Sequence, residues 1–176
     1  MEILRYPVIA LAAGWILGAV FTKLLLPFLE KKQFKQFVRE VGPQSHLSKT
    51  GTPSMGGLAI ISAAVLTSVV IGLIAGVADG WHLAVILLVM VLFGLIGFID
   101  DYEKAIKKNN AGISPKQKLV MQFVFSGAFA VYAYFFSGFG TVPGSAVWIP
   151  IADRYLDFGI LYIPFIMFVM IAFSNA

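Results

Sequence analysis

Long apolar runs set the fold class of this chain. A run of about 18 or more predominantly apolar residues can cross a bilayer as a helix. Only 12% of the 176 residues are charged and 59% are hydrophobic, so we expect no separate soluble domain. We predict an all-α, polytopic transmembrane helix bundle that forms one integral membrane domain over residues 1–176. Its five expected spans, of which the last is short, are Tyr6–Leu26, Gly56–Val77, Trp81–Ile99, Leu119–Phe136 and Phe158–Phe173.

Lysine and arginine are concentrated in two connecting segments. Residues 27–55 and 100–118 hold most of the basic side chains, whereas the other side of the bundle holds Arg5 and Arg154. Loops rich in Lys and Arg stay in the cytoplasm. We therefore expect the N-terminus outside and both basic loops inside. No small-residue cleavage site follows the first run, so we expect it to be retained as a helix.

Two pairs of glycines occur at helical spacing within the apolar runs. They are Gly14-x-x-x-Gly18 and Gly72-x-x-x-Gly76. Such pairs let two helices approach closely. They favour packing within the bundle, and a homodimer interface is the other interpretation.

Two segments outside the spans have patterns of their own. Leu29–Val41 is basic with apolar residues on one helical face, which predicts a helix at the membrane surface. Residues 137–157 are rich in glycine and proline and read as an outside loop with a short strand at Val147–Ile151.

Adjacent carboxylates follow the third apolar run at its cytoplasmic end, at Asp100 and Asp101. A helix C-terminus already carries negative charge, and neighbouring carboxylates repel each other. A divalent cation such as Mg²⁺ with a phosphorylated substrate would offset both effects. Successive helical residues point about 100° apart, so the two side chains are expected to do different work. The simpler interpretation is that they only end a membrane helix at the water line.

The loop before the second span has features of a phosphate site. Thr52 is a reasonable N-cap and Pro53 suits the first helical position, which would aim free N–H groups at an anion. Lys49 adds a positive charge and His46 a hydrogen-bond donor. Gly56-Gly57 would let a ligand or another helix come close. A capped helix entry with glycines for packing is the alternative.

The second basic loop supplies further cations. Lys104 lies one helical turn beyond Asp100, and Lys118 adjoins the next span, so these two can reach a site. Lys107 and Lys108 fit a solvated loop better. Together the three segments indicate chemistry on a phosphorylated, nucleotide-linked substrate with a lipid-borne acceptor. The basic loops lack a recognisable nucleic-acid-binding fold, so no nucleic-acid partner is expected.

Three signatures resemble the phospho-N-acetylmuramoyl-pentapeptide transferases (MraY), the lipid I synthases of the polyprenyl-phosphate N-acetylhexosamine-1-phosphate transferase superfamily. The first is residues 42–57, ending Gly51-Thr52-Pro53-Ser54-Met55-Gly56-Gly57, where Ser54 replaces the usual Thr. The second is Gly97-Phe98-Ile99-Asp100-Asp101-Tyr102 with Lys104, and the third is Gly112-Ile113-Ser114 with Lys118. The resemblance runs from residue 29 to residue 176.

This resemblance implies transfer of phospho-MurNAc-pentapeptide from UDP-MurNAc-pentapeptide to undecaprenyl phosphate, with release of UMP and a requirement for Mg²⁺. It implies a multi-pass protein of the bacterial inner membrane with a cytoplasmic active site, often dimeric. Asp100 and Asp101 would be the catalytic residues and the candidate metal ligands. The candidate substrate- and phosphate-binding residues are His46, Lys49, Thr52, Ser54, Lys104, Lys118 and Asn175.

The chain also departs from this family, which usually has ten spans. A later metal-binding aspartate and a His-rich loop are absent, so we expect an N-terminal half that is inactive alone. Sister transferases of N-acetylglucosamine phosphate share the acid pair but usually lack the Thr-Pro-Ser-Met-Gly-Gly form. An ion-coupled transporter fragment and a non-catalytic assembly protein are the alternatives of other classes.

Overall fold

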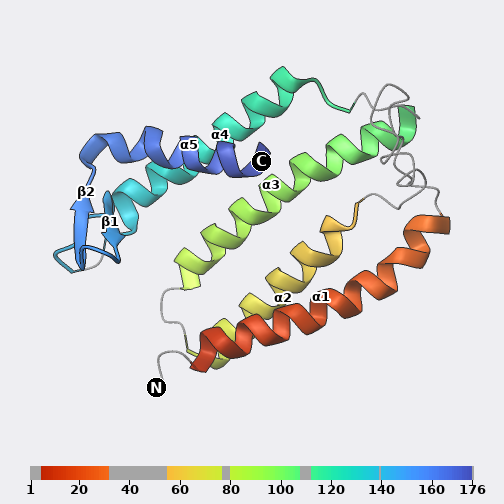
Figure 1. The fold of residues 1–176 in the computed structure, drawn as a ribbon, viewed down its shortest axis with the longest axis horizontal. Helices are drawn as coiled ribbons and strands as arrows, with labels where there is room; N and C mark the ends of the chain where they lie inside the picture. Colours follow the sequence, from red (N-terminus) through yellow and green to blue (C-terminus); the bar gives the residue numbers. More distant parts are fainter. Residues whose placement is uncertain (1–4, 32–54, 77–79, 108–111, 139, 176) are drawn as a thin grey trace. The chain divides into compact units, whose positions relative to one another are not determined.

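The computed structural model describes residues 5–31, 55–76, 80–107, 112–138 and 140–175. It is mainly helical and divides into two compact units, Met1–Ser114 and Pro115–Ala176 (Figure 1). Within the described residues, the first unit holds three long helices, and the second holds a helix pair joined through a β-hairpin.

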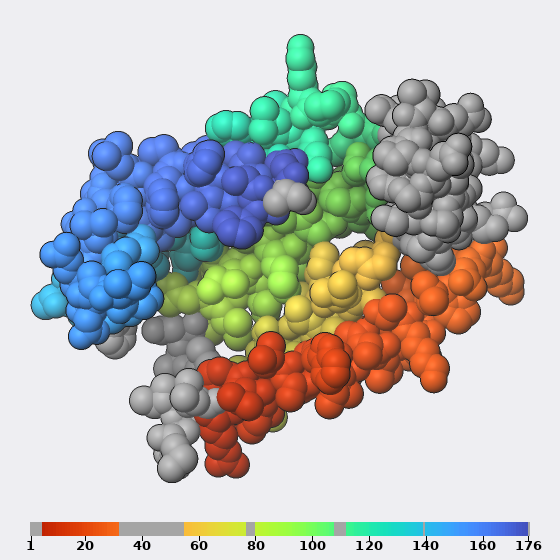
Figure 2. Space-filling view, in the orientation of Figure 1, coloured from red at the N-terminus to blue at the C-terminus, as the bar shows by residue number. Residues whose placement is uncertain are grey.

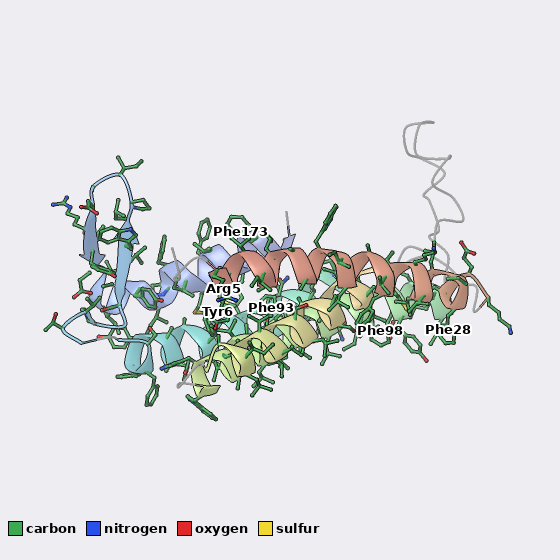
Figure 3. The ribbon with its side chains drawn as sticks, turned by 90° about the horizontal axis from the view of Figure 1, so that it is seen from below. Arg5, Tyr6, Phe28, Phe93, Phe98 and Phe173 are labelled. Carbon is green, nitrogen blue, oxygen red and sulfur yellow. The ribbon has the colours of Figure 1, made fainter. Side chains whose placement is uncertain are left out.

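The first unit consists of α1 (Arg5–Lys31), α2 (Gly57–Ile74) and α3 (Gly80–Lys107). The three helices run in alternating directions, and α2 packs against both α1 and α3 (Figure 1). In the space-filling view the side chains of α1 lie directly against those of α2 (Figure 2). Figure 3 marks the first turn of α1 with Arg5 and its last turns with Phe28.

Small residues allow these helices to approach. A Cβ atom added at Gly14 would lie 3.7 Å from Thr67 Oγ1, and one at Gly18 would lie 4.0 Å from the Cβ of Ala63. Between α2 and α3, a Cβ atom added at Gly94 would lie 2.3 Å from Ile61 Cδ1. The first glycine pair therefore packs within the bundle, as one of the two interpretations predicted.

The two glycines of the second pair, Gly72 and Gly76, have different structural roles. An added Cβ at Gly72 would lie 2.8 Å from Leu83 Cδ2, so this residue belongs to the α2–α3 contact. Gly76 has φ of +63° and follows the end of α2, the left-handed position at which glycine commonly ends a helix. The second span consequently ends at Ile74 rather than at the predicted Val77.

The second unit consists of two antiparallel helices and the hairpin between them. Helix α4 (Pro115–Phe136) leads to β1 (Ala146–Ile149) and β2 (Arg154–Asp157). A 3₁₀ turn, η2 (Gly159–Leu161), then leads into α5 (Tyr162–Asn175). The pairing runs from Ala146 opposite Asp157 to Ile149 opposite Arg154.

The hairpin corrects the predicted outside loop. The expected strand is present over Val147–Ile149, but the chain then turns and pairs with a second strand, Arg154–Asp157. All four residues of β2 are exposed, so β2 has no buried face. Strand prediction relies on alternation between a buried and an exposed face, so β2 was difficult to predict from its residues.

Helices α1 to α4 are long and apolar enough to cross a membrane. The expected fifth span is a shorter apolar helical stretch, Gly159–Asn175. The predicted surface helix Leu29–Val41 begins as the last turn of α1, which continues through Pro27 to Lys31. The rest of that segment lies outside the described residues.

Candidate active site at the acid pair

The acid pair lies inside α3 rather than at its end. The third span was expected to stop at Ile99, but α3 continues to Lys107. Asp100 and Asp101 therefore precede the helix C-terminus by about two turns. The prediction that this acid pair lies at a helix C-terminus, where its negative charge would be unfavourable, was therefore wrong. Basic residues one turn further on allow the helix to continue, since Lys104 pairs with Asp100 and Lys107 with Glu103.

Lys104 bridges the two carboxylates. Its Nζ atom lies 2.5 Å from Asp100 Oδ2 and 3.8 Å from Asp101 Oδ1. The side chains of Asp100, Asp101 and Lys104 are 18%, 34% and 37% exposed, so the cluster is half-buried yet open to solvent. A single ammonium group thus offsets the repulsion between the acids.

The segment before α2 is tied to this cluster through its backbone. The N–H of Met55 donates to Asp101 Oδ2 at 3.1 Å, and the carbonyl of Met55 accepts from the N–H of Leu58 at 3.1 Å. Met55 is buried and has φ of 70°, a left-handed conformation uncommon for a residue other than glycine. This conformation lets one residue both begin the helix turn and reach across to α3.

The start of α2 differs from the prediction. The helix begins at Gly57, and its N-cap residue, Gly56, has no side chain that could cap it. Thr52 and Pro53 are therefore too early in the chain to be the N-cap and the first residue of α2. A Cβ atom added at Gly56, Gly57 or Gly97 would meet no atom within 4 Å among the described residues. The described part of the chain thus leaves open space at these glycines instead of using them for packing.

The loop after α3 folds back onto Asp100. The N–H of Ile113 donates to Asp100 Oδ1 at 3.1 Å. A Cβ atom added at Gly112 would lie 2.0 Å from the same oxygen and 3.0 Å from the backbone oxygen of Asp100. Only glycine fits here without displacing the carboxylate. The acid pair therefore joins three segments: the entry to α2, helix α3 and the loop that follows it.

Some predicted site residues lie outside the unit that holds the acid pair or outside the described residues. Lys118 lies in the first turn of α4 and Asn175 at the end of α5, both in the second unit. Four others lie outside the described residues, namely His46, Lys49, Thr52 and Ser54.

Asn175 takes part in a polar cluster that the sequence reasoning missed. Its Nδ2 atom donates to Gln122 Oε1 at 2.9 Å and to the carbonyl of Ile171 at 2.8 Å. Gln122 Nε2 donates to Ser174 Oγ at 2.9 Å, and Gln122 is fully buried. Gln122 and Ser126, four residues apart within the apolar part of α4, were the available signal.

The acid pair fits a partial magnesium site. Among the described residues no group of three or more His, Cys, Asp and Glu side chains could hold a metal ion. Mg²⁺ is nevertheless often held by one or two carboxylates, with waters and substrate phosphates completing its octahedron. Asp100 and Asp101 offer hard oxygen ligands of this kind, and Lys104 already provides a cation beside them.

Comparison with known proteins gives the family. Residues 83–176, from within α3 through α5, match the family described as Glycosyl transferase family 4. The chain belongs to glycosyl transferase family 4. Residues 49–61 also match the phospho-N-acetylmuramoyl-pentapeptide-transferase signature 1. Within this family 4 member, that signature contains Met55, whose N–H binds Asp101.

Relatives named phospho-N-acetylmuramoyl-pentapeptide-transferase extend the match. The Staphylococcus carnosus protein is 36% identical over 163 residues, covering 93% of this chain and 50% of the relative. The Geobacillus kaustophilus protein is 40% identical over 171 residues, covering 96% and 50%. The Alkaliphilus oremlandii protein is 43% identical over 162 residues, covering 86% and 46%. The chain spans about half the length of the curated relatives it matches, and the predicted resemblance is confirmed.

Proposed function

We propose that this chain carries the acid-pair portion of a lipid I synthase. That enzyme would transfer phospho-MurNAc-pentapeptide from its UDP carrier to undecaprenyl phosphate at the cytoplasmic face of the bacterial inner membrane. The single observation that carries the proposal is the hydrogen bond from Met55, within the transferase signature, to Asp101. It links the signature directly to the carboxylates that phosphoryl-transfer chemistry needs.

The two carboxylates have different surroundings, which supports different roles. Asp100 uses one oxygen for the N–H of Ile113 and the other for Lys104. Asp101 uses Oδ2 for Met55, whereas its Oδ1 has, within the described residues, only the longer contact to Lys104. We assign Asp101 as the carboxylate with more capacity for a metal or substrate. Asp100 would orient Lys104 and accept the proton of the lipid phosphate.

The reaction requires a new P–O bond and loss of UMP. An oxygen of undecaprenyl phosphate attacks the phosphorus that carries the sugar, and the bond from that phosphorus to UMP breaks. Mg²⁺ held by Asp101 would neutralise phosphate charge. Lys104 would stabilise the negative charge on the phosphates through a charged hydrogen bond.

A chimeric enzyme tests the proposal. This chain would replace the matched stretch of the Geobacillus kaustophilus relative, and UMP release would be followed with UDP-MurNAc-pentapeptide and undecaprenyl phosphate. We expect Mg²⁺-dependent activity that falls at least about a hundredfold in Asp100→Asn and Asp101→Asn. Glu103→Gln, one turn of helix away from this chemistry and paired with Lys107, is the matched control and should remain active.

Other outcomes would contradict the proposal. Retained activity in both Asn variants would remove the acid pair from catalysis. A chimera that uses UDP-N-acetylglucosamine in preference to UDP-MurNAc-pentapeptide would instead assign the sister reaction.

A further inference from the structure

The β-hairpin of the second unit exposes an aromatic surface outside the membrane helices. Trp148 on β1 and Tyr155 on β2 are cross-strand partners, with ring centroids 4.9 Å apart. Their side chains are 43% and 55% exposed. Ile151, in the turn between the strands, is 101% exposed, so it makes essentially no contact with the described protein.

The hairpin runs across the direction of the helices that hold it. Both strands cross the run of α4 and α5 rather than continuing along it (Figures 1 and 3). Because α4 is long and apolar enough to span a membrane, a hairpin set across its end lies roughly in the plane of the membrane surface.

Short-range contacts fix this orientation. A Cβ atom added at Gly144 would lie 2.4 Å from the carbonyl oxygen of Ala133 in α4, so β1 begins in close contact with the helix. At the other end, Asp157 accepts hydrogen bonds from Ser145 Oγ at 2.6 Å and from the N–H of Gly159 at 2.8 Å. The hairpin is therefore held to both helix ends.

We propose that the Trp148–Tyr155 face and Ile151 bind the lipid headgroup layer of the bilayer. Tryptophan and tyrosine are enriched at the membrane–water interface because their rings are apolar and their tips are polar. Phe135 and Phe136, at the end of α4 that leads to the hairpin, are also exposed, by 67% and 63%. Lipid is thus the occupant that the position and the chemistry of the hairpin favour.

Fluorescence of a single tryptophan tests this assignment. The chain has three tryptophans, so Trp15→Phe with Trp81→Phe leaves Trp148 as the only one. The full chain is placed in lipid nanodiscs containing phosphatidylcholine brominated near the headgroup end of its acyl chains. We expect these lipids to quench Trp148 by about half or more, and iodide in the water to quench it several-fold less than free tryptophan.

Two neighbouring residues provide a matched pair of variants. Tyr155 and Leu156 are similarly exposed but lie on opposite faces of β2. The quantity compared is the ratio of Trp148 fluorescence in lipid without bromine to that in bromolipid. Tyr155→Asp should reduce this ratio at least twofold, whereas Leu156→Asp should leave it nearly unchanged. Using the ratio with and without bromine removes effects on the intrinsic fluorescence yield.

Three results would overturn the assignment. Strong iodide quenching without bromolipid quenching would place Trp148 in water. Protection from both quenchers would mean that protein covers the face, and dependence of this protection on chain concentration would identify a second copy. Equal effects of the two Asp variants would show that the aromatic face is not the one in contact with lipid.

Discussion

At the scale of single residues, the site depends on backbone groups as well as on the Lys104 side chain. Two of the contacts to the acid pair come from the N–H groups of Met55 and Ile113. Contacts made by a backbone N–H are nearly independent of residue type, except where there is no room for a side chain. Gly112 is such a position.

Gly112→Ala should disrupt the site without touching a charged residue. The new Cβ would overlap Asp100 Oδ1, so the loop must move away and lose the hydrogen bond from Ile113. We expect a loss of about 1–3 kcal/mol in the free energy of unfolding. Gly97→Ala is the matched control, since an added Cβ there meets open space among the described residues. It should be neutral or slightly stabilising within helix α3. Denaturant titration in bicelles measures both, and equal effects would contradict the packing argument.

At the scale of elements, the pairing of α4 with α5 rests on a few polar side chains in an apolar setting. Gln122 uses both ends of its amide, one for Ser174 and one for Asn175. Interhelical hydrogen bonds of this kind contribute about 0.6 kcal/mol on average in membranes, and up to about 1.7.

Gln122→Leu should therefore lower the free energy of unfolding by about 1 kcal/mol or more, because it also leaves Ser174 and Asn175 without these partners. Ser126→Ala is the control. Ser126 is equally buried, but its hydroxyl bonds within α4, to the carbonyl of Gln122. Loss of this hydroxyl should lower the free energy of unfolding by less than Gln122→Leu does. If detergent-induced unfolding shows the two variants to be equal, the cluster does not join the helices.

The hairpin should respond to acid through Asp157. The hydrogen bond from Ser145, together with that from the N–H of Gly159, lowers the pKa of Asp157 below its ordinary value. A lowered folded-state pKa means that this stabilisation is present above the unfolded pKa of about 3.9 and is lost as the pH falls through the lower folded value. We expect single-tryptophan emission from Trp148 to change over that range. Asp157→Asn should abolish the transition, and Ser145→Ala should move it to higher pH. A transition unchanged in both variants would assign it to another group.

At the scale of the whole molecule, the distribution of charge predicts how the chain sits in the bilayer. The basic segment 100–118 should be cytoplasmic, and the segment around the hairpin should lie on the opposite side. The chain has no cysteine, which makes labelling of introduced cysteines unambiguous.

Lys107→Cys and Thr141→Cys should therefore react from opposite sides in bacterial cells. A membrane-impermeant maleimide added outside should label Thr141→Cys, and Lys107→Cys should react only after the cells are opened. Both positions are exposed, so access to the protein surface is matched. Labelling of both from outside, or the reverse order, would overturn the predicted orientation.

The apolar spans could be predicted without the structure, because the free energy of placing apolar residues in lipid depends on composition and length. Helices α1 to α4 match four predicted runs, and Lys104, which was predicted to reach a site from one turn beyond Asp100, pairs with that residue. The signature motifs likewise indicated the family, since they are local strings of residues.

The contacts of the acid pair, in contrast, depend on how the chain folds. Met55 and Ile113 lie 46 and 13 residues from their carboxylate partners, and each donates a backbone N–H that every residue except proline carries. Three other features could not be predicted for a similar reason: the extension of α3 to Lys107, the exposed strand β2 and the hydrogen bonds of the Gln122 amide. Each depends on which groups become neighbours after folding, and a local pattern of residue types does not show which groups these are.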